Sequence, residues 1–167
     1  MTPTALTIAG SDSGGGAGIQ ADLKTFSALG VYGTSVITAI TAQNTLAVQA
    51  IHPLPAKVVV DQLNSILDDI RVDAIKIGML ANTEIIEALA GILRERVRVP
   101  LVLDPVMIAT SGCRLLDTKA VASLRTKLLP LAGVITPNLD EAGILLNRAL
   151  PTDEDEMKSA CEDLVLL

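Results

Sequence analysis

The sequence predicts an α/β fold, an open and mostly parallel sheet with helices on both faces. Two observations lead to this prediction. Short apolar runs rich in Val and Ile alternate along the chain with stretches of helical periodicity. Several of these runs are apolar at every position, as strands buried on both faces are. A chain of 167 residues is the size of one domain, so we expect a single domain over residues 1–167.

Six segments are expected to form strands. They are residues 4–9, 34–42, 48–52, 73–77, 100–104 and 133–136. Hydrophobic residues make up 50% of the chain, but Phe26 and Tyr32 are its only aromatic residues. The core is therefore expected to consist of aliphatic side chains.

Helices are expected between the strands, each after residues that favour a helix start. These starts are the glycine segment 14–18, Pro55, Asn82 or Thr83, Asp117, and Thr152 with Asp155. The apolar stripe of the second helix extends to Ile70, and Pro130 is expected to end the fourth. The acidic run from Asp153 to Glu156 is interpreted as a solvated first turn of the last helix.

Composition excludes several classes of function. The net charge is −6 and no basic stripe is present, which argues against nucleic-acid binding. No apolar run is long enough to span a membrane, and no signal-peptide pattern opens the chain. Cys113 and Cys161 lack CxxC spacing and are interpreted as free thiols of a cytoplasmic protein. His52 has no partner nearby in sequence and is interpreted as structural.

Four of the 12 glycines lie between Gly14 and Gly18, directly after the first expected strand. Glycine allows close approach and positive φ, and the N-terminus of a following helix favours anions. The segment lacks the Gly-Lys-Ser/Thr of a Walker A motif and the G-x-G-x-x-G spacing of a dinucleotide site. It is either a tight structural turn or a loop that wraps a ligand.

Polar residues and glycines follow the ends of five expected strands. They are Gly10-Ser-Asp12, Gln43-Asn-Thr45, Gly78-Met79, Asp104-Pro105 and Asn138. Because ligands of open α/β sheets bind outside the carboxyl ends of the strands, this edge is predicted to hold the functional site.

Two of these residues suit a flat heterocycle. The Gln43 amide has one acceptor and two donors, so it either pairs with an aminopyrimidine edge or satisfies loop backbone groups. Met79 either fills the core or lines an apolar slot for a ring.

The remaining polar residues suit phosphate chemistry. Asp104 is either a turn cap before Pro105 or a carboxylate ligand of Mg²⁺ beside phosphates. Asn138 and Glu141 have the spacing of a capping box. That role is compatible with Asn138 near a phosphate and Glu141 near Mg²⁺, because a helix start is also an anion site.

A series of motifs follows along the chain. They are the segment Ala5 to Phe26, Tyr32-Gly33 with Thr38-Ala39, Thr41-Ala-Gln-Asn-Thr45, Lys76-Ile-Gly-Met-Leu80, Val102-Leu-Asp-Pro-Val-Met107, Ser111-Gly112 with Leu115-Leu116, and Thr136-Pro-Asn-Leu-Asp-Glu141. In this order they resemble the hydroxymethylpyrimidine/phosphomethylpyrimidine kinases of thiamine biosynthesis, which have a ribokinase-like fold. The resemblance spans nearly the whole chain.

The resemblance implies ATP-dependent phosphorylation of 4-amino-5-hydroxymethyl-2-methylpyrimidine and then of its monophosphate. It implies a loop from Gly10 to Gly18 that closes over the hydroxymethyl or phosphate group, and it places Asn138 at the ATP phosphates. It also implies that Asp104 and Glu141 face Mg²⁺. The implied pyrimidine pocket consists of Gly10, Asp22, Gln43, Met79 and Val106, with Gln43 reading the ring edge.

Beyond the part that matches this chain, the family carries a Lys-Gly-Gly strand end, an adenine-binding region and a Gly-Thr-Gly-Cys anion hole. None of these motifs occurs in the sequence. We therefore expect an N-terminal portion of such a kinase, C-terminally incomplete, with no catalytic residue of its own. An unpaired sheet edge would favour a homodimer. A pyridoxal kinase of the same superfamily and a non-catalytic pyrimidine-binding module remain the alternatives.

Overall fold

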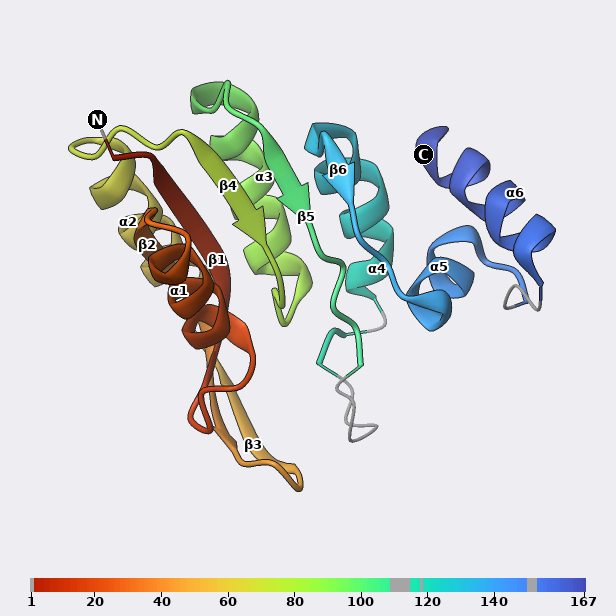
Figure 1. Ribbon diagram of the computed structural model, residues 1–167, viewed down its shortest axis with the longest axis horizontal. Coiled ribbons are helices and arrows are strands. Elements are labelled where there is room, and N and C mark those ends of the chain that lie inside the picture. Colours follow the sequence, from red (N-terminus) through yellow and green to blue (C-terminus); the bar gives the residue numbers. More distant parts are fainter. Residues whose placement is uncertain (1, 109–114, 118, 150–152) are drawn as a thin grey trace.

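One six-stranded sheet organises the chain (Figure 1). The computed structural model describes residues 2–108, 115–117, 119–149 and 153–167. The strand order is β3-β2-β1-β4-β5-β6, and within the described residues only the β2–β3 pair is antiparallel. The strands are β1 (Thr4–Asp12), β2 (Tyr32–Gln43), β3 (Val48–Pro53), β4 (Ala74–Ile77), β5 (Leu101–Leu103) and β6 (Val134–Ile135). The expected open, mostly parallel sheet is confirmed.

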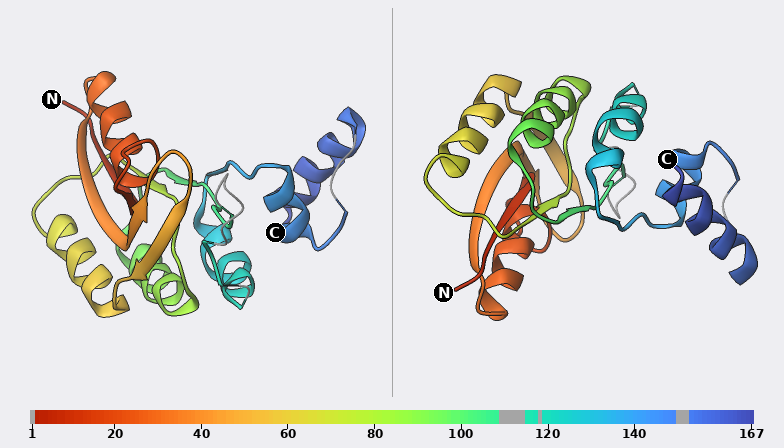
Figure 2. Two further views of the ribbon diagram at one scale, coloured as in Figure 1. Left: turned by 90° about the horizontal axis from the view of Figure 1, so that it is seen from below. Right: turned by 90° about the horizontal axis from the view of Figure 1, so that it is seen from above.

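Helices cover both faces of this sheet, as expected (Figure 2). They are α1 (Gly18–Ala28), α2 (Ala56–Leu67), α3 (Thr83–Arg96), α4 (Ala120–Ser123), α5 (Leu139–Leu146) and α6 (Glu154–Val165). Helix α1 packs on β1 and β2 from one face, whereas α2, α3 and α4 lie on the other. Helices α5 and α6 pack against each other beyond β6 (Figure 1).

The two faces of the sheet differ along β1, since one face is apolar and the other is more polar. Its residues Leu6 and Ile8 are fully buried in an aliphatic core, and Ile8 is in register with Val36 of β2 and Ile77 of β4. Successive side chains of a strand point to opposite faces. Thr7 therefore faces α1, and it pairs in register with Lys76 of β4. The α1 side of the sheet thus carries a polar pair, the buried Thr7 and the half-buried Lys76, next to the predicted site.

Two helix starts form as their sequence signals predict. Asn82 Oδ1 accepts a hydrogen bond from the Ile85 N–H at 3.0 Å and caps α3. At α5, Asn138 Oδ1 accepts from the Glu141 N–H, and Glu141 Oε2 accepts from the Asn138 N–H, both at 2.9 Å. These reciprocal bonds are the expected capping box.

The structure corrects several element boundaries. β1 and β2 extend to Asp12 and Gln43, because the two strands keep pairing past an irregularity between Ala9 and Ser11. Helix α2 ends at Leu67, so Ile70 lies in the turn that follows, where its N–H donates to the Ile66 carbonyl oxygen.

The expected fourth helix is divided into three parts. After α4 the chain forms a π-helical turn (Leu124–Leu128) and a 3₁₀ turn (Leu129–Leu131). Pro130 therefore lies inside the last turn instead of after it. A proline is tolerated there because the first positions of a helical turn need no intrahelical N–H donor.

The last helix begins one residue later than its predicted start signal. Asp153 caps α6 by accepting from the Glu156 N–H at 2.9 Å, whereas Thr152 lies outside the described residues. Ser111, Gly112 and Cys113 lie outside them as well. Among the described helices, none has both the length and the apolar character needed to cross a membrane.

Candidate functional site

The carboxyl ends of β1, β2, β4 and β5 surround an open cavity of about 720 Å³. Six of the eight predicted site residues line it: Gly10, Asp22, Gln43, Met79, Asp104 and Val106. They come from the ends of four strands and from α1. Asn138 and Glu141 are not among the described residues that line this cavity. The structure therefore gathers the predicted pyrimidine pocket and one of the predicted metal ligands in one place.

The glycine loop is built around the carboxylate of Asp12. Its Oδ1 accepts from the Gly14 N–H at 2.7 Å, and its Oδ2 accepts from the N–H groups of Gly16 and Ala17 at 2.9 and 2.8 Å. Asp12 as a whole residue is only 5% exposed. These amides at the start of α1 therefore bind an anion that the chain itself supplies.

Gly18 is required by the geometry of this region, and Gly10 is closely packed. Gly18 has a φ of +56°, and a Cβ added there would lie inside van der Waals contact of the Gly10 carbonyl oxygen. A Cβ added at Gly10 would lie 3.0 Å from Met79 Sδ. The loop is thus a tight structural turn that also lines the cavity, whereas its wrapping of a ligand stays a prediction.

Lys76 connects two carboxylates at the wall of the cavity. Its Nζ lies 3.2 Å from Asp22 Oδ1 and 3.6 Å from Asp104 Oδ2, and its side chain is 25% exposed. Asp22 also accepts a hydrogen bond from the Thr7 hydroxyl at 2.6 Å. Because Asp22 is on α1, Lys76 on β4 and Asp104 after β5, this network links three elements.

Burial raises the pKa of Asp104 above its usual range. The neighbouring Lys76 ammonium opposes this shift, whereas the charge of Asp22 adds to it. The side chain of Asp104 is 33% exposed, and among the described residues its partner is the Lys76 ammonium rather than a backbone N–H of a turn. The geometry therefore does not support the reading of Asp104 as a turn cap.

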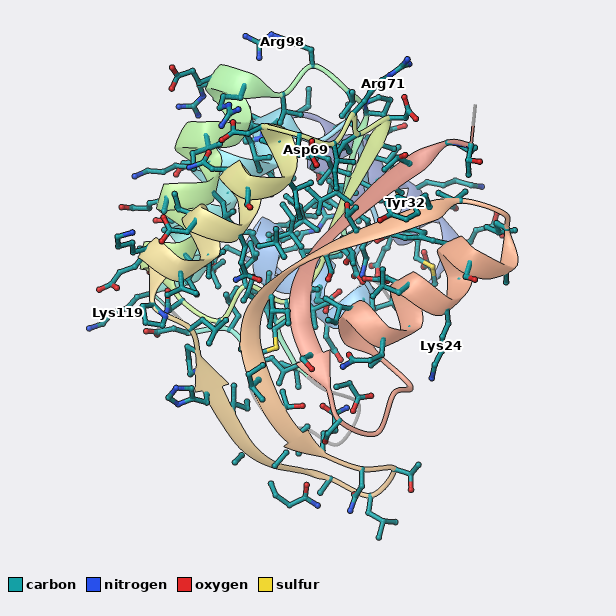
Figure 3. All side chains as sticks on the ribbon, turned by 90° about the vertical axis from the view of Figure 1, so that its left-hand side faces the viewer. Lys24, Tyr32, Asp69, Arg71, Arg98 and Lys119 are labelled. Atoms are coloured by element: carbon teal, nitrogen blue, oxygen red, sulfur yellow. The ribbon has the colours of Figure 1, made fainter. Side chains whose placement is uncertain are left out.

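Four other cations of the chain are labelled in Figure 3. Lys24, Arg71, Arg98 and Lys119 are exposed and lie on the outside of the molecule (Figure 3). Lys24 contributes to the loop from outside by donating to the Gly15 carbonyl oxygen at 2.7 Å. Among the described residues that line the cavity, Lys76 is the only cation.

Gln43 ends β2 and Met79 follows β4, and these two strands flank β1, which carries Gly10. Gln43 is half-buried at the end of β2, where its Oε1 accepts from the Thr41 hydroxyl at 3.3 Å. Met79 is 7% exposed, and its carbonyl oxygen accepts from the Thr38 hydroxyl at 2.6 Å. Met79 therefore belongs to the core and to the cavity wall at once.

Glu141 is buried and its carboxylate is engaged on both sides. Oε2 accepts from the Asn138 N–H, and Oε1 accepts from the Met107 N–H at 3.3 Å. Burial raises the pKa of Glu141, the two N–H donors lower it, and the charges of Asp104 and Asp140 raise it further. This carboxylate fastens the start of α5 to the segment after β5.

Asp12 and Lys76 are the two residues that sequence reasoning left out of the site. A signal for Asp12 was present, since an acid followed by Ser-Gly-Gly-Gly suits a turn in which the side chain binds nearby N–H groups. Lys76 gave a weaker signal, a single charge within an apolar strand. Its partners depend on which strand and helix lie beside it.

Comparison with known proteins identifies the same kinase family that the sequence motifs indicate. A family model described as phosphomethylpyrimidine kinase matches residues 12–167. The chain is 57% identical over 165 residues to the hydroxymethylpyrimidine/phosphomethylpyrimidine kinase of Rhizobium meliloti, covering 99% of this chain and 62% of that protein. It is 56% identical over 153 residues to the enzyme of the same name from Escherichia coli, covering 92% and 58%. The chain thus spans less than two thirds of the length of these curated relatives.

Solved structures of two kinds of kinase are also similar. A crystal structure of phosphomethylpyrimidine kinase from Clostridium difficile has a TM-score of 0.91 at 48% identity, covering 99% of this chain and 71% of that one. An ADP complex of Bacillus subtilis pyridoxal kinase has a TM-score of 0.89 at 41% identity, covering 99% and 63%. These neighbours agree with the expected ribokinase-like fold.

Proposed function

Because this chain belongs to the phosphomethylpyrimidine kinase family, we propose that it supplies the substrate side of such a kinase. The reaction is transfer of phosphate from ATP to 4-amino-5-hydroxymethyl-2-methylpyrimidine, and then to its monophosphate, in thiamine biosynthesis. One observation carries the proposal. The pyrimidine-pocket residues that the resemblance implies, together with Asp104, line a single cavity at the carboxyl ends of the strands.

The pyrimidine is proposed to lie between Met79 and Val106, with its edge toward Gln43. A primary amide offers one acceptor and two donors, which matches the amino group and ring nitrogen of an aminopyrimidine. Met79 packs directly against Gly10, because a Cβ added at Gly10 would lie 3.0 Å from Met79 Sδ, so both residues would form one side of the ring site. Asp22, held by Thr7 and Lys76, limits the other side of the pocket.

The phosphate side of the cavity is proposed to be the region of Asp104. Mg²⁺ in kinases is held by one or two carboxylates together with substrate phosphates, and Asp104 is a partly exposed carboxylate on the cavity wall. It therefore fits such an ion, which when bound would neutralise charge on the phosphates. No group of three or more potential metal-ligating side chains occurs among the described residues.

Asn138 and Glu141 are proposed to act at the same edge through the start of α5. The two Glu141 oxygens already accept backbone N–H groups, so we propose that Glu141 orients the segment after β5 and faces the ion from behind Asp104. Asn138 at the N-cap would leave the start of α5 directed at an ATP phosphate. Catalysis would come mainly from positioning and charge neutralisation, and no catalytic residue is assigned to this chain.

The proposal is tested with the full-length protein, ATP and the pyrimidine alcohol. Gln43→Ala is expected to raise KM for the pyrimidine alcohol, and Asp104→Ala is expected to abolish turnover by lowering kcat. Asp61→Ala, which removes an exposed carboxylate paired with Lys57 on α2, is the matched control. Full activity of both site variants would refute the site assignment.

A pyridoxal kinase is the second candidate, and the similarity to the Bacillus subtilis enzyme favours it. Both substrates are flat six-membered heterocycles that carry a hydroxymethyl group, so the cavity alone does not separate them. Competition between the pyrimidine alcohol and pyridoxal in one assay decides. A higher kcat/KM for pyridoxal would replace the first candidate with the second.

A non-catalytic pyrimidine-binding module is the alternative from another class. Calorimetry distinguishes it, since the module would bind the pyrimidine alcohol in a folded protein that transfers no phosphate. We also propose a homodimer. Sedimentation velocity measures the mass directly. The cytoplasmic location inferred from the thiols stays a prediction.

A further inference from the structure

The hydroxyl of Ser13 ties the glycine loop to the backbone of Gln43. Ser13 Oγ donates to the Gln43 carbonyl oxygen at 2.7 Å and accepts from the Gln43 N–H at 2.8 Å. The last backbone pair of β1 with β2 is Asp12 with Thr41. The Ser13 side chain therefore takes over the pairing where the main chain of β1 turns away into the loop. One hydroxyl satisfies both backbone polar groups of Gln43.

Neighbouring contacts hold the same two segments together. The Thr41 hydroxyl donates to the Ser11 carbonyl oxygen at 2.8 Å. A Cβ added at Gly14 would lie 3.4 Å from the Gln43 carbonyl oxygen and from Asn44 Cα. The loop thus packs directly on the end of β2.

Gln43 has few other restraints on its peptide groups. Its pairing with β3 is irregular, because the register shifts between Ala42 and Gln43. The next residue, Asn44, begins the turn to β3, where its side chain accepts from the N–H groups of Leu46 and Ala47. The direction in which the Gln43 side chain leaves the backbone therefore depends on Ser13, together with the pairing of Gln43 with Val48 and the contact of its Oε1 with the Thr41 hydroxyl.

We propose that Ser13 is a positioning residue that sets Gln43 for recognition of an aminopyrimidine ring. The inference rests on the proposed function, because it takes Gln43 as the residue that reads the ring edge. It goes beyond that function by linking ring recognition to the loop that lies over the reacting hydroxymethyl group. A shift of the loop would move Gln43, and a ring bound at Gln43 would hold the loop.

The test compares variants of the full-length protein. Ser13→Ala removes both hydrogen bonds, whereas Ser13→Thr keeps the hydroxyl at an exposed position that has room for a methyl group. Ser123→Ala is the matched control, because Ser123 donates an exposed hydrogen bond to Glu87 on the far side of the sheet from α1. Gln43→Ala reports the loss of ring recognition itself.

Two measurements are made on each variant. Calorimetry gives the Kd for the pyrimidine alcohol, and steady-state kinetics separate KM from kcat. Ser13→Ala is expected to raise Kd and KM about tenfold, as for a lost hydrogen-bond pair of about 1.4 kcal/mol, with little change in kcat. Ser13→Thr is expected to restore binding, and Ser123→Ala to leave it unchanged.

Amide hydrogen exchange tests the contact between the Ser13 hydroxyl and the Gln43 backbone without any ligand. The Gln43 N–H is expected to exchange about tenfold faster in Ser13→Ala than in the unchanged protein, since its acceptor is gone. Exchange in Ser13→Thr and Ser123→Ala should match the unchanged protein. Equal exchange in Ser13→Ala would show that the hydroxyl does not hold Gln43 and would overturn the inference.

The binding results separate this inference from the proposed function. If the unchanged protein binds the pyrimidine alcohol and Gln43→Ala does not, unaltered binding by Ser13→Ala overturns the inference alone. Equal loss of binding in Ser13→Ala and Ser13→Thr also overturns it, since the hydroxyl would not be the cause. If the unchanged protein itself fails to bind the pyrimidine alcohol, the proposed function fails, and this inference fails with it.

Discussion

Removal of the Asp12 carboxylate is predicted to destabilise the glycine loop and the start of α1. The substitution Asp12→Ala deletes the acceptor of three backbone hydrogen bonds, from Gly14, Gly16 and Ala17. In the part of the chain that the structure describes, Asp12 is the side-chain acceptor of all three N–H groups. The perturbation is therefore local. The stability that is lost depends on how far water replaces Asp12 as the hydrogen-bond partner of these three N–H groups.

The magnitude lies between two limits. Three hydrogen bonds to a charged group, at about 1.5–3 kcal/mol each, give an upper limit of about 4–9 kcal/mol. Gly14, Gly16 and Ala17 are exposed, so water replaces part of this contribution. Removal of a single N-cap side chain costs about 0.5–2 kcal/mol. We expect a loss of about 2–3 kcal/mol of unfolding free energy for Asp12→Ala.

Urea denaturation followed by circular dichroism measures this loss. Asp153→Ala is the matched control, because Asp153 caps α6 outside the cavity by accepting one exposed hydrogen bond from the Glu156 N–H. We expect this variant to lose about 1 kcal/mol of unfolding free energy. Asp12→Asn keeps one acceptor oxygen but turns an amide donor toward an N–H, so it should lose about half as much as Asp12→Ala.

The same variants give a second readout in binding. Asp12→Ala is expected to weaken binding of the pyrimidine alcohol, because the loop that lines the cavity loses its shape, whereas Asp153→Ala is not. A stability loss in Asp12→Ala no larger than in Asp153→Ala would refute the reasoning. So would tighter phosphate binding at vacated amides with no loss of stability, because the loop would then be a preformed anion site.

Three further substitutions test other parts of the structure. Gly18→Ala is expected to cost about 3 kcal/mol in urea denaturation, because it combines a positive φ with a backbone clash at Gly10. Lys76→Met removes the charge that lowers the raised pKa of Asp104, so that pKa should rise further in a carboxyl-carbon NMR titration. A raised folded-state pKa means that the folded state takes up the proton first. Stability therefore increases as pH falls through that pKa toward the ordinary value of 3.8, and more so in Lys76→Met. Asn138→Ala breaks the capping box and should lower Tm by about 2–4 °C, the equivalent of about 1 kcal/mol.

Each of these has a control within the chain. Gly91→Ala in α3 introduces a Cβ with no neighbour within 4 Å and should be neutral or stabilising; equal behaviour of Gly18→Ala would contradict the clash. Lys57→Met, which breaks an exposed ion pair, should leave the titration of Asp104 unchanged. For the capping box, Asn138→Asp is the control because it keeps the acceptor for the Glu141 N–H. An unchanged Tm in Asn138→Ala would show that the cap contributes nothing.

Sequence reasoning succeeded where an interaction is local. The capping box of Asn138 with Glu141 joins residues three apart, and the start of α3 at Asn82 depends on one side chain and one nearby N–H. Both are visible as spacing. The alternation of apolar runs with helical periodicity likewise determined the fold class, because burial on two faces dictates the composition of a strand.

Sequence reasoning failed where backbone geometry or distant packing decides. The helical stretch after Asp117 changes from α to π to 3₁₀, although its apolar spacing is that of an ordinary helix. The hydrogen bond from the Met107 N–H to Glu141 Oε1 was not foreseen, whereas a place for Glu141 near a metal ion stays a prediction. That contact depends on how α5 docks on the segment after β5, which no local pattern encodes.

The sequence by itself determined the mostly parallel sheet and the edge of it at which six of the eight expected site residues line one cavity. Only the tertiary structure decided how these residues meet. Register places Thr7 of β1 beside Lys76 of β4 and brings Ser13 to Gln43, 30 residues away. Register is fixed by the packing of the whole sheet and its helices rather than by any single segment. The partners of a side chain at a strand end therefore become visible only once the strands are paired.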